Sequence, residues 1–286
     1  MPELPEVETV RRGLERRLVG RSLGDVEVTG MRTVRRTSSA ALVTGLDGVT
    51  VRGVERRGKY LVLRFDEGAR AMIHLRMSGQ VLIAGRTDPR PAHTHVVMGL
   101  SDDAERGRGE EVRFVDPRTF GEVVAYREAD AAVLVPELDR LGWDPLLEPE
   151  AMTPRRWRAL LAGRRRQLKA LLLDQHPVAG IGNIYSDEIL HRARLRPGRR
   201  SDDLSAQQAR RLLGTIGEVL AEAVAHGGSS LRDAQYVDVD GRQGGYQAFH
   251  RVVDKEGHWC GTCDRARIRR SVAAGRSSYW CPWCQR

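Results

Sequence analysis

Apolar side chains near the start of the chain follow the spacing of an amphipathic helix. They recur every three or four positions, at Val7, Val10, Leu14 and Leu18. This predicts a helix over residues 6–18, with Pro5 in its first turn. The pattern then changes to short β-branched and apolar runs, which predict strands at residues 25–29, 49–54, 60–65, 71–75, 80–84, 95–100, 111–115 and 122–126. Their close spacing, with Gly, Asp and Pro between them, favours an antiparallel sandwich or barrel.

The second half of the chain is predicted to be helical. Thr153 and Pro154 form a helix-start signal, a cap followed by a first-turn proline. Helical patterns follow at residues 155–162, 167–175, 184–193 and 205–226, and the last stops at Gly227-Gly228. The chain is thus expected to be α+β, with a β domain (1–135), a proline-rich linker (136–152), a helical domain with a loop at 228–246 (153–246) and a small Cys module (247–286).

Composition excludes several classes of protein. Of the 286 residues, 41% are hydrophobic and 30% are charged, which fits neither a disordered chain nor a coiled coil. No apolar run reaches the ~18 residues that a membrane helix needs, and the acidic start MPELPEVE is not a signal peptide. We therefore expect a cytoplasmic protein without a membrane partner.

The net charge of +9 is unevenly distributed. Residues 155–200 carry 12 basic and 3 acidic side chains, and residues 251–286 carry 8 and 3, so these stretches have net charges of +9 and +5. The rest of the chain is slightly acidic. Two basic stretches on a near-neutral body indicate a polyanionic partner, most often nucleic acid. The alternative is an ordinary Arg-rich solvated surface.

The strongest spacing signal lies in the last 27 residues, which contain all the cysteines. The motif pairs Cys260-x2-Cys263 with Cys281-x2-Cys284 across 17 residues. Four thiolates in this pattern predict one closed tetrahedral Zn2+ site, structural rather than catalytic. Unligated or disulfide-paired cysteines are the alternative. Five arginines between the pairs would suit a phosphate or groove contact.

Three other features suggest chemistry, each with an ordinary alternative. The turn from Gly180 to Asn183 joins two helices in the basic region, where backbone N–H groups and an amide can hold a phosphate, although it also fits a plain loop. Removal of Met1 would expose the secondary amine of Pro2, a candidate nucleophile, with Glu3 beside it to move protons. Lys59 is one of three lysines among 47 basic residues, and can serve either as a proton-transfer group or as a strand-edge charge.

Together these segments resemble the formamidopyrimidine-DNA glycosylase family of the Fpg/Nei superfamily. The resemblance covers the whole chain and rests on MPELPEVETVRRGLE (1–15), RRGKYLVL (56–63), IHLRMSG (73–79), DPRTFG (116–121), GIGNIYSDEIL (180–190) and the four-Cys finger. It implies an N-terminal antiparallel β-sandwich with a flanking helix, a C-terminal helical domain with a helix–two-turn–helix, and a zinc finger. It also implies a monomeric bacterial base-excision-repair enzyme of the nucleoid that removes oxidised purines from double-stranded DNA and then nicks the strand by β,δ-elimination.

The resemblance also assigns roles to individual residues. Pro2 matches the nucleophile that attacks C1′, Glu3 the general acid/base, and Lys59 a lysine that contacts phosphate and assists β-elimination. Arg276 matches the finger arginine that binds phosphate and assists δ-elimination. The remaining DNA contacts that it implies are His93, Arg118, Arg165, Lys169 and Asn183.

Extrusion of a base from a duplex leaves a hole, and three residues match the family's void-filling set. Met77 would be the apolar plug, Arg118 the cation that bonds the orphaned cytosine, and Phe120 the aromatic wedge. Core positions are the alternative for Met77 and Phe120, but Pro and Gly around DPRTFG favour an exposed loop tip.

Two other functions compete with this interpretation. An endonuclease VIII-like relative for oxidised pyrimidines typically begins MPEGPE and lacks the complete void-filling set, whereas this chain has Leu4 and all three residues. A zinc-dependent DNA-binding protein without catalysis would not need Pro2, Glu3 and Lys59. The chain departs from the family pattern at Val253-Asp254-Lys255 and at GRQGGYQ in the loop 228–246, and these positions bear on the choice of lesion.

Overall fold

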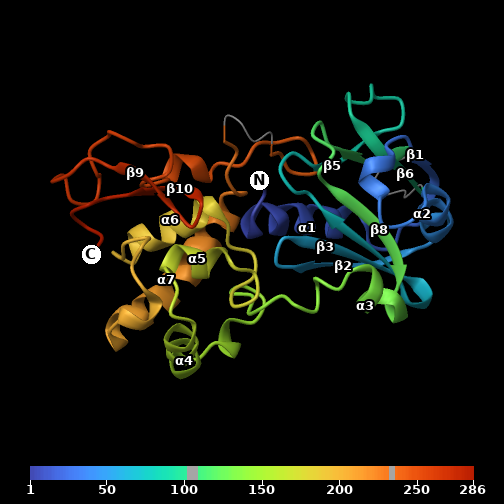
Figure 1. Cartoon of the computed structure of the whole chain (residues 1–286). Helices are drawn as coiled ribbons and strands as arrows, with labels where there is room; N and C mark the ends of the chain where they lie inside the picture. The colour runs from blue at the N-terminus through green and yellow to red at the C-terminus, as the bar shows by residue number, and fades with distance from the viewer. Residues whose placement is uncertain (102–108, 232–235) are drawn as a thin grey trace. The chain divides into compact units, whose positions relative to one another are not determined.

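A computed structural model describes residues 1–101, 109–231 and 236–286 (Figure 1). These residues form two compact units: residues 1–139 with 226–245, and residues 140–225 with 246–286. The segment after the last long helix thus belongs to the N-terminal unit, although the sequence places it in a helical domain over 153–246. Residues 232–235 of the predicted loop 228–246 lie outside the described residues.

The N-terminal unit is built on two antiparallel four-stranded sheets, which confirms the predicted sandwich. One sheet has the order β1-β6-β7-β5, with β1 at Leu23–Val28, β6 at Thr94–Leu100, β7 at Glu110–Val115 and β5 at Gln80–Gly85. The other has the order β2-β3-β4-β8, with β2 at Val51–Arg57, β3 at Tyr60–Phe65, β4 at Ala69–His74 and β8 at Glu122–Arg127. All eight predicted strands are present, with ends shifted by a few residues.

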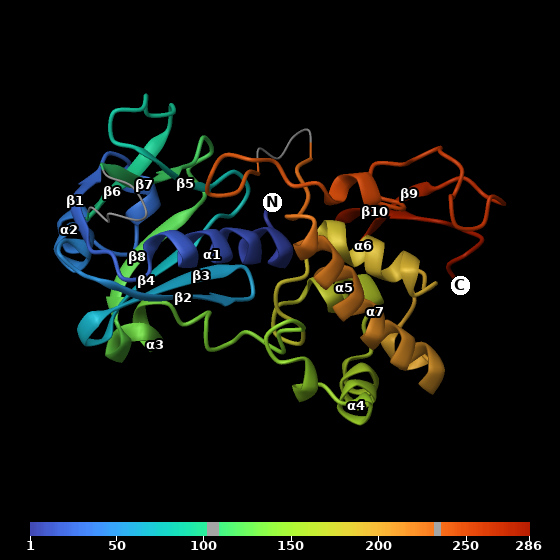
Figure 2. The same ribbon diagram turned by 180° about the vertical axis from the view of Figure 1, so that it is seen from behind.

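A single hydrophobic core joins both sheets to helix α1 (Leu4–Leu18), which packs against β2 and β3 (Figure 2). The apolar stripe that predicted this helix, from Val7 to Leu18, is fully buried. Two short helices in this unit, α2 (Ser39–Leu46) and α3 (Ala131–Leu134), were not predicted. Val239, which follows α7 in the chain, contacts the edge strand β5, where Ile83 donates its backbone N–H to the carbonyl of Val239 at 2.8 Å.

The second unit contains the four predicted helices: α4 at Pro154–Arg164, α5 at Leu168–Leu173, α6 at Asn183–Arg192 and α7 at Ala206–Ala225. The Thr153 hydroxyl caps α4 by accepting the backbone N–H of Arg156 at 3.3 Å, as its sequence position predicted. In the part of the chain that the structure describes, no helix is long and apolar enough to cross a membrane.

A hairpin that the sequence did not predict closes the second unit. Strands β9 (Arg269–Ala273) and β10 (Arg276–Trp280) pair around Ala274 and Gly275, whose φ angles are 52° and 71°. Positive φ at both central residues is the requirement of a type I′ turn, whose twist matches that of the flanking strands. This hairpin leads directly into Cys281.

Candidate active site and metal centre

The first turn of α1 fixes the N-terminal segment. Glu6 accepts the backbone N–H of Glu3 through Oε2 at 2.7 Å, which is one half of a capping box. Pro2 and Glu3 are both buried, and only 2% of Glu3 is exposed. The candidate nucleophile Pro2 and the carboxyl of Glu3 beside it are therefore held in place by the first turn of α1.

The same carboxylate also holds the segment that follows α7. Glu6 Oε1 accepts the backbone N–H of Ser229 at 2.7 Å. Gly228 has a φ of +77°, and a Cβ there would lie 2.7 Å from Glu6 Oε1, so the backbone can approach this closely only as glycine. Tyr236 Oη donates to the carbonyl of Gly227 at 3.1 Å and packs in the same core. Glu6 is thus a positioning residue that the sequence reasoning missed, although its spacing from Glu3 is that of a capping box.

Lys59 lies in the tight turn between β2 and β3 and is only 7% exposed. Arg56 stabilises this turn, because its guanidinium donates to the carboxylate of Glu8 at 3.0 Å and to the carbonyl of Gly58 at 3.1 Å. Burial alone would raise the pKa of Glu8, but Arg11 and Arg56 outweigh it and the pKa is lowered. Lys59 is therefore a buried side chain at a hairpin turn whose backbone is bound by Arg56.

Positive charge around this hairpin also acts on His74 at the end of β4. Its imidazole is 5% exposed, and Nδ1 accepts the backbone N–H of Arg76 at 3.0 Å. Burial, together with the charges of Arg76 and Lys59, lowers the pKa of His74 to about 3. His74 is therefore neutral throughout the physiological range.

The three void-filling candidates are exposed, and two of them lie in one loop. Met77 is 40% and Phe120 is 47% exposed, so neither is a core residue. Arg118 is exposed as well, and its guanidinium lies 5.3 Å from the centre of the Phe120 ring. The loop-tip interpretation of DPRTFG agrees with this geometry.

One fully buried carboxylate, Asp116, organises both loops that carry these residues. It accepts the backbone N–H of Gly121 at 2.7 Å and of Arg118 at 3.2 Å, and it also accepts the hydroxyl of Ser78, the neighbour of Met77. Its own backbone N–H donates to the carbonyl of His93 at 3.0 Å. Asp116 belongs to the DPRTFG motif, but the sequence analysis predicted no role for it. An Asp that precedes a Pro at a turn is the signal that could have identified it.

In the second unit, the side chain of Gln175 forms two hydrogen bonds with the glycine turn before α6. Its amide accepts the backbone N–H of Gly180 at 2.8 Å and donates to the carbonyl of Ile181 at 2.9 Å. Gly180 has a φ of 90°, which explains a glycine at that point. Asn183 opens α6 half-buried, and its Oδ1 has no hydrogen-bond partner among the described residues. This oxygen is buried and can only accept a hydrogen bond, so it is not itself a contact for an anionic ligand.

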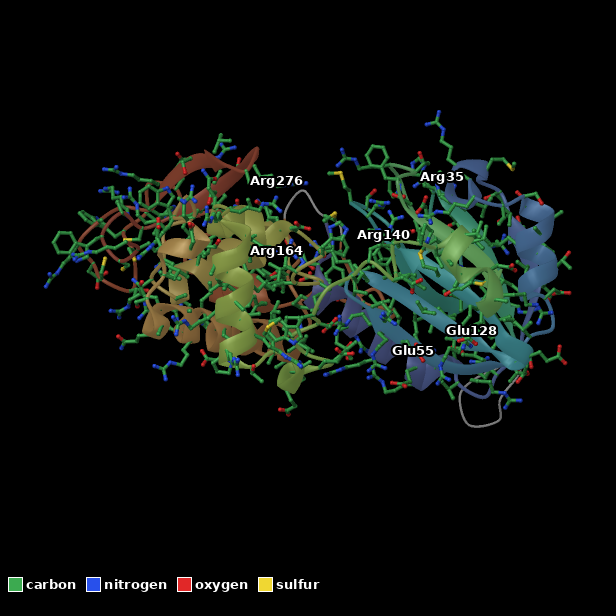
Figure 3. The ribbon with its side chains drawn as sticks, turned by 60° about the horizontal axis from the view of Figure 1, so that its bottom comes forward. Arg35, Glu55, Glu128, Arg140, Arg164 and Arg276 are labelled. Atoms are coloured by element: carbon green, nitrogen blue, oxygen red, sulfur yellow. The ribbon has the colours of Figure 1, made fainter. Side chains whose placement is uncertain are left out.

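The other candidate DNA contacts differ in exposure. His93, with a φ of 65°, and Arg165, with a φ of 45°, are both exposed at loop positions. Arg276 is exposed at the start of β10, beside the hairpin turn (Figure 3). Lys169 is fully buried, and its Nζ donates to Asp187 at 2.7 Å and to the carbonyl of Ser277 at 2.8 Å. Nζ therefore already has two acceptors inside the protein, which leaves at most one of its three N–H groups for a phosphate.

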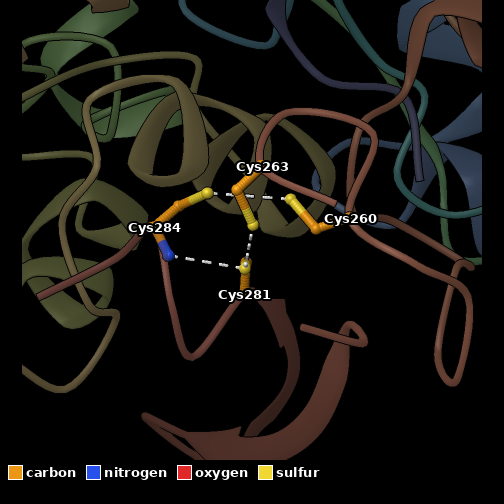
Figure 4. A group of neighbouring side chains, drawn as sticks. All are labelled: Cys260, Cys263, Cys281 and Cys284. Carbon is orange, nitrogen blue, oxygen red and sulfur yellow. Dashed lines mark hydrogen bonds between the residues drawn. The ribbon is translucent and has the colours of Figure 1, made fainter. Parts of the chain in front are cut away.

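The four cysteines converge on one point (Figure 4). They are free thiols whose Sγ atoms all lie within 4.8 Å of one another, and they form a structural metal site. Cys260 and Cys281 are buried, whereas Cys263 and Cys284 are half-exposed. Disulfide pairing, the alternative open at the level of sequence, does not describe this cluster, because the S···S distances of 3.7 Å far exceed a bond of about 2.05 Å.

Helix α6 supports this module through three side chains that the sequence reasoning did not single out. Asp187 accepts the backbone N–H of Tyr279 at 2.9 Å. Glu188 accepts three consecutive backbone N–H groups, from Arg251 to Val253, at 2.8 to 3.0 Å. Burial raises the pKa of Glu188, and these three donors oppose that shift. His191 Nε2 lies 3.5 Å from the Sγ of Cys260.

Two family models match the chain. Residues 1–123 match the "Formamidopyrimidine-DNA glycosylase N-terminal domain", and residues 141–235 match the "Formamidopyrimidine-DNA glycosylase H2TH domain".

Relatives that carry the same name match over full length. The chain is 43% identical to the formamidopyrimidine-DNA glycosylase of Salinispora arenicola, covering 100% of this chain and 96% of the relative. It is 42% identical to that of Thermus thermophilus, covering 100% and 98%.

Solved structures agree with these matches. A complex between the Lactococcus lactis Fpg and DNA containing an abasic site has a TM-score of 0.88 at 34% identity over 99% of both chains. The MutM (Fpg) protein from Thermus thermophilus has a TM-score of 0.85 at 40% identity over 99% of this chain and 98% of that one. The motifs, the fold and these matches lead to one conclusion: the chain belongs to the formamidopyrimidine-DNA glycosylase family.

Proposed function

We propose that this protein is a base-excision-repair DNA glycosylase that removes oxidised purines from duplex DNA and then cleaves the strand as an AP lyase. The observation that carries the proposal is the N-terminal segment, where Pro2 and a buried Glu3 are fixed by the start of α1. Related structures were solved with DNA that contains Fapy-dG, carbocyclic 8-oxo-G or an abasic site, the substrates and intermediate of such a reaction. We place its activity on the bacterial nucleoid.

The first step uses the secondary amine of Pro2 after removal of Met1. Its nitrogen attacks C1′ of the damaged nucleotide, the glycosidic bond breaks, and the base leaves with a proton. The resulting iminium ion links Pro2 to the opened sugar. Glu3 is the proton carrier for the sugar and the departing base.

The iminium ion makes the C2′ proton and then the C4′ proton of the sugar acidic, and the loss of these protons cleaves the strand. Loss of the C2′ proton breaks the C3′–O bond and releases the 3′ strand with a 5′-phosphate. Loss of the C4′ proton then breaks the C5′–O bond and leaves a 3′-phosphate on the upstream fragment of the same strand. We assign Lys59 to the first elimination and Arg276 to the second, since each supplies a cation for a departing phosphate. Water finally hydrolyses the Schiff base and restores Pro2.

The exposed side chains of the first unit are assigned to the hole left by the extruded base. Met77 and Phe120 have the exposed apolar surface that a wedge needs, and Arg118 stacks on Phe120 and supplies guanidinium donors for an orphaned cytosine. We assign the phosphate contacts to His93 and Arg165, which are exposed at loop positions, and to Asn183, whose side-chain amide can donate to a phosphate at the N-terminus of α6.

We propose that the metal is one structural Zn2+. A tetrahedron with Zn–S bonds of about 2.3 Å has S···S edges of about 3.8 Å. The Sγ pairs of Cys260 with Cys284 and of Cys263 with Cys281 are each 3.7 Å apart, and all four Sγ atoms lie within 4.8 Å of one another, so the spacing of the cysteines suits this ion. Four thiolates fill the coordination shell, and the zinc would hold the finger together while taking no part in the reaction.

Borohydride reduction tests the proposal, because it converts the iminium into a stable bond. The processed protein should be trapped on 8-oxoguanine:C and on abasic duplexes, with the adduct on the N-terminal peptide in mass spectra. Pro2→Gly and protein that retains Met1 should lose the adduct, whereas Pro5→Ala, a neighbouring proline within α1, should keep it. Absence of trapping by the processed wild-type protein would refute the enzyme function. Preference for thymine glycol over 8-oxoguanine would instead assign the chain to the pyrimidine-specific activity.

A further inference from the structure

Helix α6 carries a carboxylate that is wholly buried and bound to strand β10. Asp187 Oδ1 accepts the hydroxyl of Ser278 at 2.8 Å, and Oδ2 accepts the backbone N–H of Tyr279 at 2.9 Å. Neither Asp187 nor Ser278 is measurably exposed. One side chain of the helix thus fixes two successive residues of the strand.

The partner of Asp187 binds the same strand from α5. Lys169 Nζ donates to Asp187 Oδ1 at 2.7 Å and to the backbone carbonyl of Ser277 at 2.8 Å. Lys169 is also fully buried. The ion pair therefore holds three consecutive residues, Ser277 to Tyr279, through both side-chain and backbone atoms.

Among the described residues, the hairpin has a further side-chain anchor at the other end of β10, where the guanidinium of Arg196 lies 4.9 Å from the centre of the Trp280 ring. The first four residues of β9 are exposed, and β10 pairs only with β9 in its sheet. Besides the ion pair, β10 is continuous with the metal ligand Cys281. Arg276 directly precedes Ser277 and extends from this strand into solvent (Figure 3). Its position consequently depends on where the ion pair holds the strand.

A buried ion pair is a poor source of stability, because removing two charges from water offsets most of their attraction. Its best-attested use is to fix one arrangement among several of similar stability. A charge pair that binds successive residues of one strand suits that use, since a shift of the strand by one residue would break the hydrogen bonds that Ser277, Ser278 and Tyr279 make with the two charges.

We propose that Lys169 and Asp187 are positioning residues that hold β10 in register and thereby place Arg276 for the second elimination. The inference rests on the proposed function, in which Arg276 assists that step. In this proposal Lys169 acts on the reaction by holding the finger strand. The residue that contacts the phosphate is then Arg276, whereas the sequence predicted a direct phosphate contact for Lys169.

The test measures products from an abasic-site duplex. Lys169→Met and Asp187→Asn should accumulate the β-elimination product, with the ratio of δ- to β-product at least fivefold below wild type, as should Arg276→Ala. The rate of borohydride trapping by Asp187→Asn should stay within twofold of wild type, because Asp187 has no role in the attack by Pro2. Arg276→Ala combined with Lys169→Met should lower the ratio no further than Arg276→Ala alone.

Arg192→Met is the control, because it also removes a cation from an ion pair of α6, but one that joins α6 to Glu222 of α7 instead of to β10. Its product ratio should equal that of wild type. If Lys169→Met or Asp187→Asn does not fold, Ser278→Ala removes one hydrogen bond to Asp187 and should shift the ratio in the same direction. Hydrogen exchange should rise across residues 276–280 in each positioning variant.

Two results would overturn the inference. One is an unchanged product ratio in folded Lys169→Met and Asp187→Asn. The other is a salt dependence of DNA binding that is flattened by Lys169→Met and left intact by Asp187→Asn, which would assign Lys169 to a phosphate. Failure of the proposed function is a different outcome, in which wild type itself gives neither adduct nor cleavage.

Discussion

Asp116→Asn tests whether one buried carboxylate sets up the void-filling loops. The wild-type side chain accepts from Gly121, Arg118 and Ser78, and it is fully buried. An amide offers one acceptor oxygen instead of two. In either orientation of this amide, its NH2 group faces a backbone N–H, that of Gly121 or that of Arg118. That backbone N–H then has no acceptor.

The size of the effect follows from that loss. A buried donor without an acceptor costs about 1–3 kcal/mol, and about 1.4 kcal/mol corresponds to a tenfold change in an equilibrium. If the loss falls on the ordered form of the loops, kcat/KM for 8-oxoguanine excision should fall about tenfold. Cleavage of a preformed abasic site should fall less, because no stacked base has to be extruded.

The assay compares single-turnover excision of 8-oxoguanine with cleavage of an abasic duplex by the same preparation. Asp144→Asn is the matched control, because Asp144 is a buried turn carboxylate that accepts the backbone N–H groups of Leu146 and Leu147, both at 3.1 Å, in the other unit. The ratio of the two activities should change only in Asp116→Asn. A wild-type ratio in that variant would refute the role given to Asp116.

Three further predictions concern a buried histidine, the metal site and a phosphate contact. The pKa of His74 is about 3 in the folded protein and about 6.5 in the unfolded chain, so below pH 6.5 only the unfolded chain binds a proton at this residue. The free energy of unfolding should therefore fall by about 1.4 kcal/mol per pH unit below pH 6.5. Between pH 7 and pH 5 the urea midpoint should fall less steeply for His74→Gln than for wild type, and equal slopes would contradict this. His191→Phe removes the contact to the Cys260 thiolate and should speed zinc loss to a colorimetric chelator about tenfold, whereas His250→Phe, another buried histidine of the same unit, should not. Arg276→Ala should weaken DNA binding and reduce its salt slope by about one phosphate, and an unchanged slope would argue against a phosphate contact.

Local patterns sufficed for much of the fold. The eight sandwich strands and the helices α1, α4 and α7 follow from apolar periodicity and caps, which are properties of short segments. The β9–β10 hairpin was missed because its sequence is largely polar and shows no apolar alternation. The cysteine spacing identified a metal site for the same local reason.

Long-range pairs were beyond the sequence. Lys169 and Asp187 are 18 residues apart, and nothing in the composition around them indicates that they meet in the interior. Glu6 and Ser229 are separated by 223 residues, and Asp116 and Ser78 by 38. The sequence therefore indicated which side chains have suitable chemistry, whereas the residues that position them became visible only in the structure.

The cysteine cluster has a consequence for the conditions under which the protein works. Oxidised purines form when a cell is exposed to oxidants, and thiolates are among the first protein groups that oxidants attack. Cys263 and Cys284 are half-exposed, so they are the sulfurs that a soluble oxidant meets first, while Cys260 and Cys281 are shielded. Loss of either exposed ligand would release the metal next to the strand that carries Arg276. Repair capacity would then decline as damage accumulates, and the rate of that decline would depend on how long the two outer thiolates survive.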